Sequence, residues 1–297
     1  MNLGVRLAPA LIALLVSGPS GPDTGLAARS FVPAVEAAWT TLEPGLDLAL
    51  FPGPSAAPGD GKIWIVRIDP ARFDLKLVNA SAGDSRPRTV RAWALASGAV
   101  AAINAGMFQT DGLTSIGMMR TREHRNNPRR SSRLKALLAF DPLAPGLPPV
   151  RILDATCGEL QSLPAYGTLI QSIRMVSCDR KNVWARDARR WSTAAIGIDG
   201  DGRALFIHAR SPWPVHDLVQ ALLALPVDLR RAMYLEGGPE AQLFVRAGGR
   251  EVDRLGARER AAQDGDAGFA WEIPNAVVAV RRPPSGTASS APPGPMN

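Results

Sequence analysis

Along most of the chain, apolar residues recur at every second position or in short continuous runs, the two patterns typical of β-strands. The runs at 63–68 and 73–78 are separated by Asp69-Pro70, which predicts two strands joined by a turn. Similar runs predict strands over 99–104, 115–120, 134–140, 232–235, 242–245 and 273–280. The pattern therefore predicts a domain in which strands dominate.

Two stretches show helical spacing instead. Thr89 to Leu95 predicts a short helix with Thr89 as its cap, and Pro212 to Leu225 predicts a longer helix with one apolar face. Between them, Asp199-Gly200-Asp201-Gly202 joins two apolar runs and predicts a hairpin turn. Together these elements predict a single α+β domain with a mixed, mainly antiparallel sheet and packed helices.

The two ends differ in composition from the middle. Arg6, the apolar run 7–16 and the small residues near Leu26-Ala27-Ala28 are typical of a secretory signal peptide, with a buried helix as the alternative. The run is shorter than the roughly 20 residues that span a bilayer. We expect a signal at 1–28, a Pro/Gly/Ala-rich lead-in at 29–60, the domain at 61–280 and a disordered tail at 281–297. These features predict a periplasmic or secreted protein without stable membrane insertion.

Composition narrows the classes of protein further. The chain has 297 residues, 46% of them hydrophobic, enough to bury a full core. Cys157 and Cys178 are its only cysteines, and they fit either one disulfide in an oxidising compartment or two buried thiols. Neither they nor the three histidines show the close spacing of metal ligands, so no metal and no cofactor is expected.

Positive charge is in excess, with 34 Lys and Arg against 27 Asp and Glu, a net charge of +7. Such a balance permits nucleic-acid or membrane-surface binding. The densest basic segment, Arg120 to Lys135, lacks the interleaved aromatic residues that stack on bases. It is interpreted as an exposed arginine-rich loop or as a rim that attracts an anionic substrate, and no nucleic-acid partner is expected.

The candidate chemistry lies where strands end. The apolar run 233–235 stops at Glu236, which is followed at once by Gly237-Gly238. A carboxylate beside backbone that lacks Cβ is typical of a binding or catalytic site, while a solvated Glu before a glycine turn is the alternative. The strand 99–104 delivers Asn104 in the same way, two residues before Gly106.

Three motifs occur in a fixed order: Asn104-Ala105-Gly106-Met107-Phe108, the hairpin at 195–207, and Leu235-Glu236-Gly237-Gly238. In this order and spacing, over about residues 60–280, the chain resembles the phosphodiester glycosidase family. The resemblance implies a hydrolase that cleaves glycosyl-1-phosphodiester linkages of an envelope or extracellular glycan or glycoconjugate.

The chain departs from the family pattern at three places. Glu236 stands where most members have Asp, which keeps the charge, and Pro239-Glu240 replaces a Gly-Ser pair. Thr193 stands where an Arg is common, although Arg189 and Arg190 lie just upstream. The missing Arg favours a second hypothesis, a non-catalytic glycan- or exopolysaccharide-binding protein on the same fold.

The resemblance also implies roles for individual residues. Glu236 is the expected general base or nucleophile, with Asn104 as its catalytic companion. Gly237 and Gly238 would offer backbone N–H groups, and Glu240 is a possible second carboxylate. The remaining expected substrate-binding residues, for sugar hydroxyls or phosphate, are Gly106, Arg120, Gln171, Ser172 and Arg174.

Overall fold

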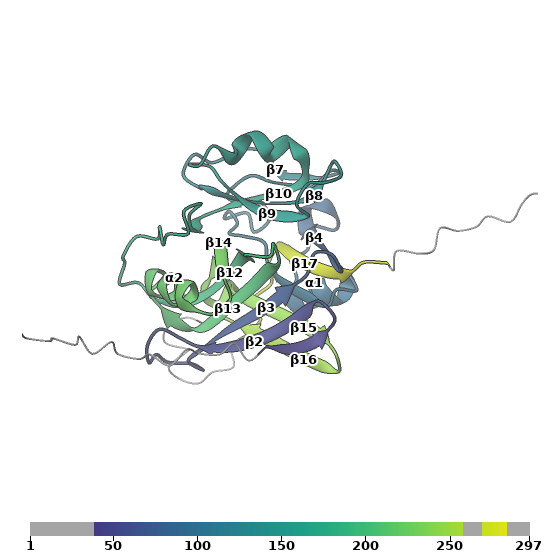
Figure 1. Cartoon of the computed structure of the whole chain (residues 1–297). Coiled ribbons are helices and arrows are strands. Elements are labelled where there is room, and N and C mark those ends of the chain that lie inside the picture. The colour runs from purple at the N-terminus through teal and green to yellow at the C-terminus, as the bar shows by residue number, and fades with distance from the viewer. Residues whose placement is uncertain (1–38, 258–268, 284–297) are drawn as a thin grey trace, which may run out of the picture. The chain divides into compact units, whose positions relative to one another are not determined.

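The computed structural model describes residues 39–257 and 269–283, and its largest element is a seven-stranded antiparallel sheet (Figure 1). Its middle strands are β12 and β13, which form the predicted hairpin around Asp199. In spatial order the strands are β1 (Thr40–Glu43), β2 (Leu46–Pro52), β3 (Lys62–Ile68), β13 (Ala204–Trp213), β12 (Trp191–Asp199), β14 (Leu229–Gly237) and β11 (Arg174–Val176).

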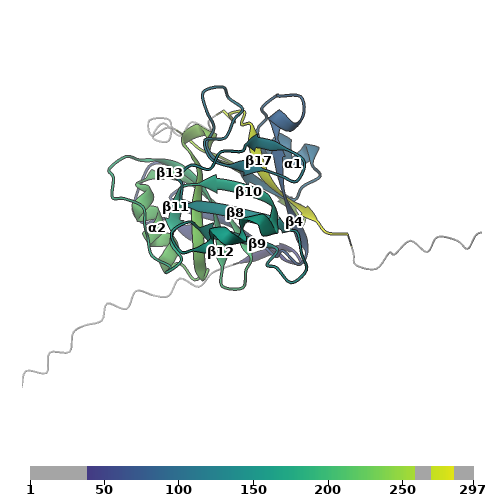
Figure 2. The ribbon, with the colours of Figure 1, turned by 90° about the horizontal axis from the view of Figure 1, so that it is seen from above.

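Two five-stranded sheets complete the described part of the fold. The β5 sheet runs in the order β16 (Arg250–Leu255), β15 (Gln242–Ala247), β5 (Ala101–Asn104), β17 (Asn275–Arg281), β4 (Phe73–Asn79). The β10 sheet runs in the order β7 (Arg125–Asn127), β6 (Met119–Arg120), β10 (Tyr166–Ser172), β8 (Ala136–Pro142), β9 (Val150–Asp154). Seen from above, β10, β8 and β9 lie in front of the other sheets (Figure 2).

Helices make up only a small part of the described fold. In the described residues, α1 (Val90–Ala96) begins at the predicted Thr89 cap, and α2 (Val215–Ala224) covers the seven-stranded sheet. Short 3-10 turns are η1 (Ala80–Ala82), η2 (Glu159–Ala165) and η3 (Gly238–Glu240). The prediction of mainly antiparallel sheet is confirmed, but the α+β class with packed helices overstated the helical content, because nearly every other apolar run has the strand period.

The three sheets share one apolar core. A single cluster of buried side chains draws on all of them: Ile196 and Leu235 from the seven-stranded sheet, Ile103 and Val277 from the β5 sheet, Leu138 and Ile170 from the β10 sheet. Because close-packed interiors resist displacement, this core fixes the ends of strands from different sheets relative to one another.

Two element predictions differ from the structure. The predicted lead-in at 29–60 contains β1 and β2, and β2 pairs with β3 along its whole length, so the sheet begins at Thr40 and not at 61. Of the predicted strand 115–120 only β6 forms, since the Ser115 backbone N–H donates to the Asn126 side chain instead of a ladder partner.

The predicted signal peptide and most of the predicted tail lie outside the described residues. Within the described ranges, no helix has the length and apolar character needed to cross a bilayer.

Candidate functional site

Three strands, one from each sheet, end close together at what we call the strand-end junction. β14 ends at Gly237, β5 at Asn104 and β10 at Ser172. The Asn104 side-chain amide donates to the carbonyl of Glu240, three residues beyond the end of β14. The predicted Asn and Glu motifs, 132 residues apart in sequence, therefore meet in the fold.

The end of β10 joins the same junction. The Tyr234 backbone N–H donates at 2.9 Å to the carbonyl of Ile173, the residue directly after Ser172. Gly106 reaches the junction from β5, since a Cβ built on it would lie 3.9 Å from the Ile170 side chain. Its φ of +128° is a conformation that L side chains rarely adopt, which explains the glycine of the first motif.

Glu236 sits on a bulge of β14. Its strand partner is Ala194, while Tyr234 pairs with the next residue, Ala195, so Leu235 has no residue opposite it. The Glu236 side chain is mostly removed from water, and its Oε1 accepts from the Gly237 N–H at 3.1 Å.

The electrostatics around Glu236 favour its neutral form. Burial raises its pKa to about 8; the Gly237 hydrogen bond acts against this shift, and the nearby Glu240 carboxylate adds to it. Among the described residues, no Lys or Arg forms an ion pair with Glu236. The carboxyl group is therefore largely protonated at neutral pH.

The two positions after Glu236 require glycine for different physical reasons. A Cβ on Gly237 would lie 2.0 Å from the Tyr234 hydroxyl and 2.4 Å from the Trp191 ring, so packing excludes any side chain there. Gly238 has φ of +67°, the left-handed region that favours glycine. This tight path turns the chain into η3, which carries Glu240 back beside Glu236.

An aromatic wall, which sequence reasoning missed, borders Glu236. The rings of Trp184 and Tyr234 are 5.2 Å apart, and Trp191 contacts the same tyrosine across Gly237. Burial and then the Glu236 charge raise the pKa of Tyr234, so its hydroxyl stays protonated. The only sequence signal for the wall was two tryptophans in a basic loop, because their meeting with Tyr234 depends on strand pairing.

A cation lies at this wall. The Arg189 guanidinium is 5.5 Å from the centre of the Trp191 ring, and it pairs with Asp187 at 2.5 Å. Arg189 is one of the two arginines upstream of Thr193, the position where an Arg is common in the family that the sequence resembles. Thr193 itself is buried opposite Gly237, and its hydroxyl has no hydrogen-bond partner among the described residues.

Asn104 holds the turn that carries Glu240. Its side chain is buried, its Nδ2 donates to the Glu240 carbonyl, and its Oδ1 accepts from the Gln242 N–H at 2.7 Å. The two ends of the amide thus bind backbone at the end of η3 and at the start of β15. The structure gives Asn104 a positioning role, and direct contact with a sugar stays a prediction.

His208, on strand β13, supports the same turn. It pairs with Ala194, the residue opposite Glu236, and its Nε2 lies 3.2 Å from the carbonyl of Ala241. Complete burial lowers its pKa to about 3, so the ring is neutral and Nε2–H is the donor to that carbonyl. The sequence left open whether His208 faces the site; the structure places it beneath η3.

Gln171 and Arg120 are engaged in the β10 sheet. The Gln171 amide accepts from the N–H groups of Met118 and Ser131 and donates to the carbonyls of Ser131 and Leu134. Arg120 donates to the carbonyls of Gly167 and Tyr166. These contacts occupy the whole Gln171 amide and two of the five N–H donors of Arg120. The buried Ser172 hydroxyl at the junction, in contrast, has no partner among the described residues.

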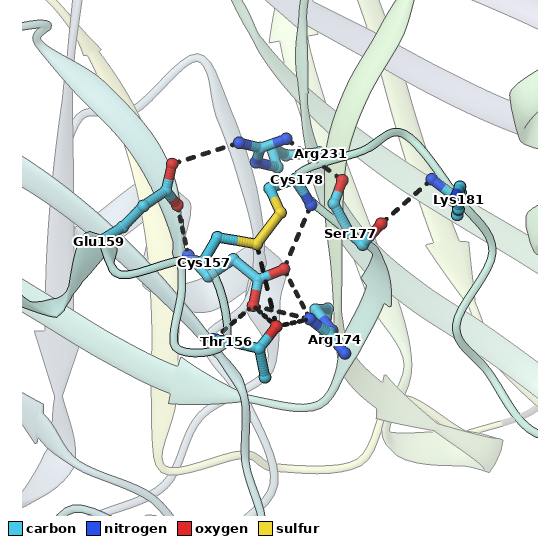
Figure 3. A network of polar contacts seen from close by, with 9 residues as sticks. Thr156, Cys157, Glu159, Arg174, Ser177, Cys178, Lys181 and Arg231 are labelled. Atoms are coloured by element: carbon cyan, nitrogen blue, oxygen red, sulfur yellow. Dashed lines mark hydrogen bonds and ion pairs between the residues drawn. A yellow bond between two sulfur atoms is a disulfide. The ribbon is translucent and has the colours of Figure 1, made fainter.

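Arg174 is held by a buried carboxylate (Figure 3). Its guanidinium donates to both oxygens of Asp154 at 2.7 Å and also to the Thr156 hydroxyl. Burial alone would raise the pKa of Asp154, but the hydrogen bonds from Arg174 and Thr156 outweigh it and bring the pKa below its usual value. Arg174 thus neutralises Asp154, and its charge is not free for a phosphate.

A disulfide closes over this ion pair. Cys157 and Cys178 are bonded, which decides between the two cysteine alternatives, and the Cys178 N–H donates to Asp154 at 3.2 Å. Possible metal-ligating atoms of these three residues lie within 4.8 Å of one another. The sulfurs are bonded to each other and the carboxylate to Arg174, so we interpret the cluster as a structural tie between β9 and β11.

Comparisons with known proteins agree with the sequence motifs. The family model described as phosphodiester glycosidase matches residues 97–280. The fold is similar to the catalytic domain of zebrafish N-acetylglucosamine-1-phosphodiester α-N-acetylglucosaminidase, auto-inhibited by its pro-peptide, with a TM-score of 0.56 and 13% identity over 83% of this chain and 87% of that one. A hypothetical protein from Synechocystis gives a TM-score of 0.54 and 12% identity, over 84% of this chain and 64% of that one. No curated protein sequence gives a match.

Proposed function

The chain belongs to the phosphodiester glycosidase family, and from this premise we propose that it hydrolyses glycosyl-1-phosphodiester linkages of an envelope or extracellular glycan or glycoconjugate. The observation that carries the proposal is Glu236: a carboxyl group with a raised pKa, at the meeting point of three strand ends, next to glycine backbone and a second carboxylate. Perturbed ionisable groups of this kind are characteristic of catalytic sites.

The raised pKa supports the role of general acid for Glu236, where the sequence interpretation gave it the role of base or nucleophile. In the proposed step, water adds to the anomeric carbon while the bond from that carbon to the phosphate oxygen breaks. Glu236 gives its proton to the departing phosphate oxygen, and Glu240 accepts a proton from the water. Glu236 can act as the acid because burial keeps it protonated, and Glu240 lies close enough to act beside it.

A neutral Glu236 also suits an anionic substrate. A phosphodiester carries one negative charge, and an ionised carboxylate beside it would repel it in a partly dry site. A protonated carboxyl instead donates a hydrogen bond that strengthens as charge develops on the leaving phosphate. The cation that we assign to the phosphate is Arg189, at the Trp191 edge of the junction. Its pair with Asp187 is exposed, unlike that of Arg174 with the buried Asp154. Because water weakens an exposed pair, a phosphate can replace Asp187.

We further propose that the protein acts in the periplasm or outside the cell, after removal of a signal at 1–28. The Cys157–Cys178 disulfide supports an oxidising compartment. Amino-terminal sequencing of the protein purified from its native host tests this: a start near residue 29 supports it, and an intact residue 1 contradicts it.

A non-catalytic glycan-binding protein is the second candidate, favoured by one observation. Thr193 fills the position where family members commonly have an Arg, and it is buried with a hydroxyl that has no partner within residues 39–257 and 269–283. Such a protein would keep its ligand and show no turnover.

The deciding experiment measures phosphodiester cleavage by the protein on an N-acetylglucosamine-1-phosphodiester and a panel of other sugar-1-phosphodiesters. Glu236→Gln should lower turnover by about 10²–10⁴-fold, the usual contribution of a general acid. Glu251→Gln, which removes an exposed carboxylate on β16, is the control and should leave turnover unchanged. Full activity of Glu236→Gln contradicts the assignment. A folded wild-type protein without turnover on the whole panel, but with binding, favours the second candidate.

A further inference from the structure

A cavity of about 810 Å³ lies away from the strand-end junction, between the edge strand β4 and the β10 sheet. Its volume falls within the usual range for small-molecule sites. None of the junction residues Asn104, Ser172 and Glu236 lines it. Thr168, which does, is four residues before Ser172 on β10, about 13 Å along an extended strand.

The cavity has apolar residues on both sides. On one side, five consecutive residues of β4, from Phe73 to Leu77, line it; Phe73 is buried in the core, and Leu75 is partly exposed. On the other side, Phe140 and Val150 are buried, whereas Pro142 and Pro149 keep exposed surface. The apolar surface that a ligand can touch therefore includes Leu75, Pro142 and Pro149.

The rim is polar and its charges balance. Arg122 forms a two-pronged pair with Asp141 at 2.5 and 2.6 Å, and Arg282 pairs with Asp74 at 2.7 Å. The remaining charged lining residues, Lys76 and Glu123, have opposite signs. With as many acidic as basic side chains around it, the cavity gives no net attraction to a phosphate or another anion.

We propose that this cavity is a second, non-catalytic binding site for a neutral oligosaccharide. A sugar ring combines apolar C–H faces with a ring of hydroxyls that donate and accept hydrogen bonds. The exposed carbons of Leu75, Pro142 and Pro149 match the faces, and the paired carboxylates and guanidinium groups of the rim match the hydroxyls. The inference stands on this cavity alone and does not require turnover at Glu236.

The edge of β4 argues against an extended peptide as the occupant. Within the described residues β4 is the last strand of its sheet, where a peptide strand would add. Lys76 and the Arg282–Asp74 pair place charge along that edge, an arrangement by which proteins discourage strand addition. A saccharide uses the side-chain groups of the rim and needs no continuous ladder.

Calorimetric titration of the full chain with chitotetraose and maltotetraose, with glucose 1-phosphate as the anionic comparison, tests the proposal. Leu75→Trp fills the cavity, and Asp141→Asn removes a rim charge while keeping a side chain that tolerates the φ of +60° at this residue. Each should weaken binding of at least one neutral probe by about tenfold, which corresponds to about 1.4 kcal/mol. Leu50→Trp on the exposed face of β2 is the matched control, and it and Glu236→Gln should bind as the wild type does.

A measurement on the wild-type protein makes the test independent of how the variants fold. Amide chemical shifts of Lys76 and Thr168 should change when the neutral probe is added. The proposal is overturned if no neutral probe binds, if glucose 1-phosphate binds these residues more tightly, or if only Glu236→Gln abolishes binding. It is equally overturned if an extended peptide, and no saccharide, shifts these amides.

Discussion

Two buried carboxyl groups in this protein have opposite electrostatics. Asp154 lies under the disulfide with the Arg174 guanidinium on both of its oxygens, and its pKa is lowered despite its burial. Glu236 lies at the strand-end junction without an ion-pair partner among the described residues, beside a second carboxyl group, that of Glu240, and its pKa is raised to about 8. Burial acts in the same direction on both groups, so the neighbouring charge decides the outcome.

This difference separates a structural site from a chemical one. A carboxylate that is ionised and fully paired ties β9 to β11 but has no proton to give. A carboxyl whose pKa is raised by folding lowers the free energy of unfolding as the pH rises, because the unfolded chain can ionise it more easily. Such a group is retained at a position where a proton donor is useful. Substitutions around Asp154 and around Glu236 should therefore have different effects.

The largest effect on stability is expected from Arg174→Met. It leaves Asp154 buried without its cation, which typically costs about 3–5 kcal/mol in the free energy of unfolding. Denaturant unfolding measures the loss. Arg88→Met, which breaks the exposed pair with Asp84, is the matched control and should cost at most about 1 kcal/mol. A loss no larger than that of the control would show that Asp154 does not depend on Arg174.

Removal of the disulfide should have the next largest effect. Cys157→Ser combined with Cys178→Ser frees a loop whose ends are 21 residues apart, and a cross-link of this kind contributes roughly 2–4 kcal/mol. Thermal unfolding of the double variant and the wild type, both without reductant, gives the difference. Equal unfolding temperatures would mean that the ion pair alone ties β9 to β11.

The pH dependence of stability distinguishes the two carboxyls. Since the pKa of Glu236 is higher in the folded than in the unfolded chain, Glu236 contributes nothing below about pH 4.5 and destabilises the fold increasingly as the pH rises toward 8. Glu236→Gln should therefore leave stability nearly unchanged at pH 4 and raise it by about 2 kcal/mol at pH 6, because each pH unit between 4.5 and 8 is worth about 1.36 kcal/mol. An equal effect at both pH values would contradict the raised pKa.

The smallest expected effect concerns Glu240. Its charge is a lesser cause of the shift than burial, so Glu240→Gln should lower the pKa of Glu236 by only a small part of its rise. A ¹³C titration of the Glu236 carboxyl measures the change, because Glu240→Gln also removes the proposed base and lowers turnover. A pKa of Glu236 that rises in this variant would mean that the two carboxyls do not interact as described.

Patterns within short stretches of sequence predicted the strands, the two helices and the strand-end positions of Asn104 and Glu236. They worked there because strand period and glycine conformation are local properties. The lead-in at 29–60 was misjudged because Pro, Gly and Ala dominate its composition, although Leu46, Leu48 and Phe51 are buried on β2.

These local patterns could not predict which residues far apart in sequence contact each other. Arg174 was assigned to a phosphate because nothing near it in sequence reveals that Asp154, 20 residues earlier on another sheet, neutralises it. The side chain of Asn104 was assigned to a substrate for the same reason, as its partners follow β14. The Trp184–Tyr234 contact likewise arises only when β14 is paired.

The most direct test of the account is a ¹³C NMR titration of the side-chain carboxyls of Glu236 and Asp154 in the folded protein. We predict that Glu236 titrates near pH 8 while Asp154 titrates below the usual range for an Asp. A Glu236 carboxyl that ionises near pH 4.5 would contradict the account, because the protein would then hold no carboxylic acid at the junction to protonate a leaving phosphate.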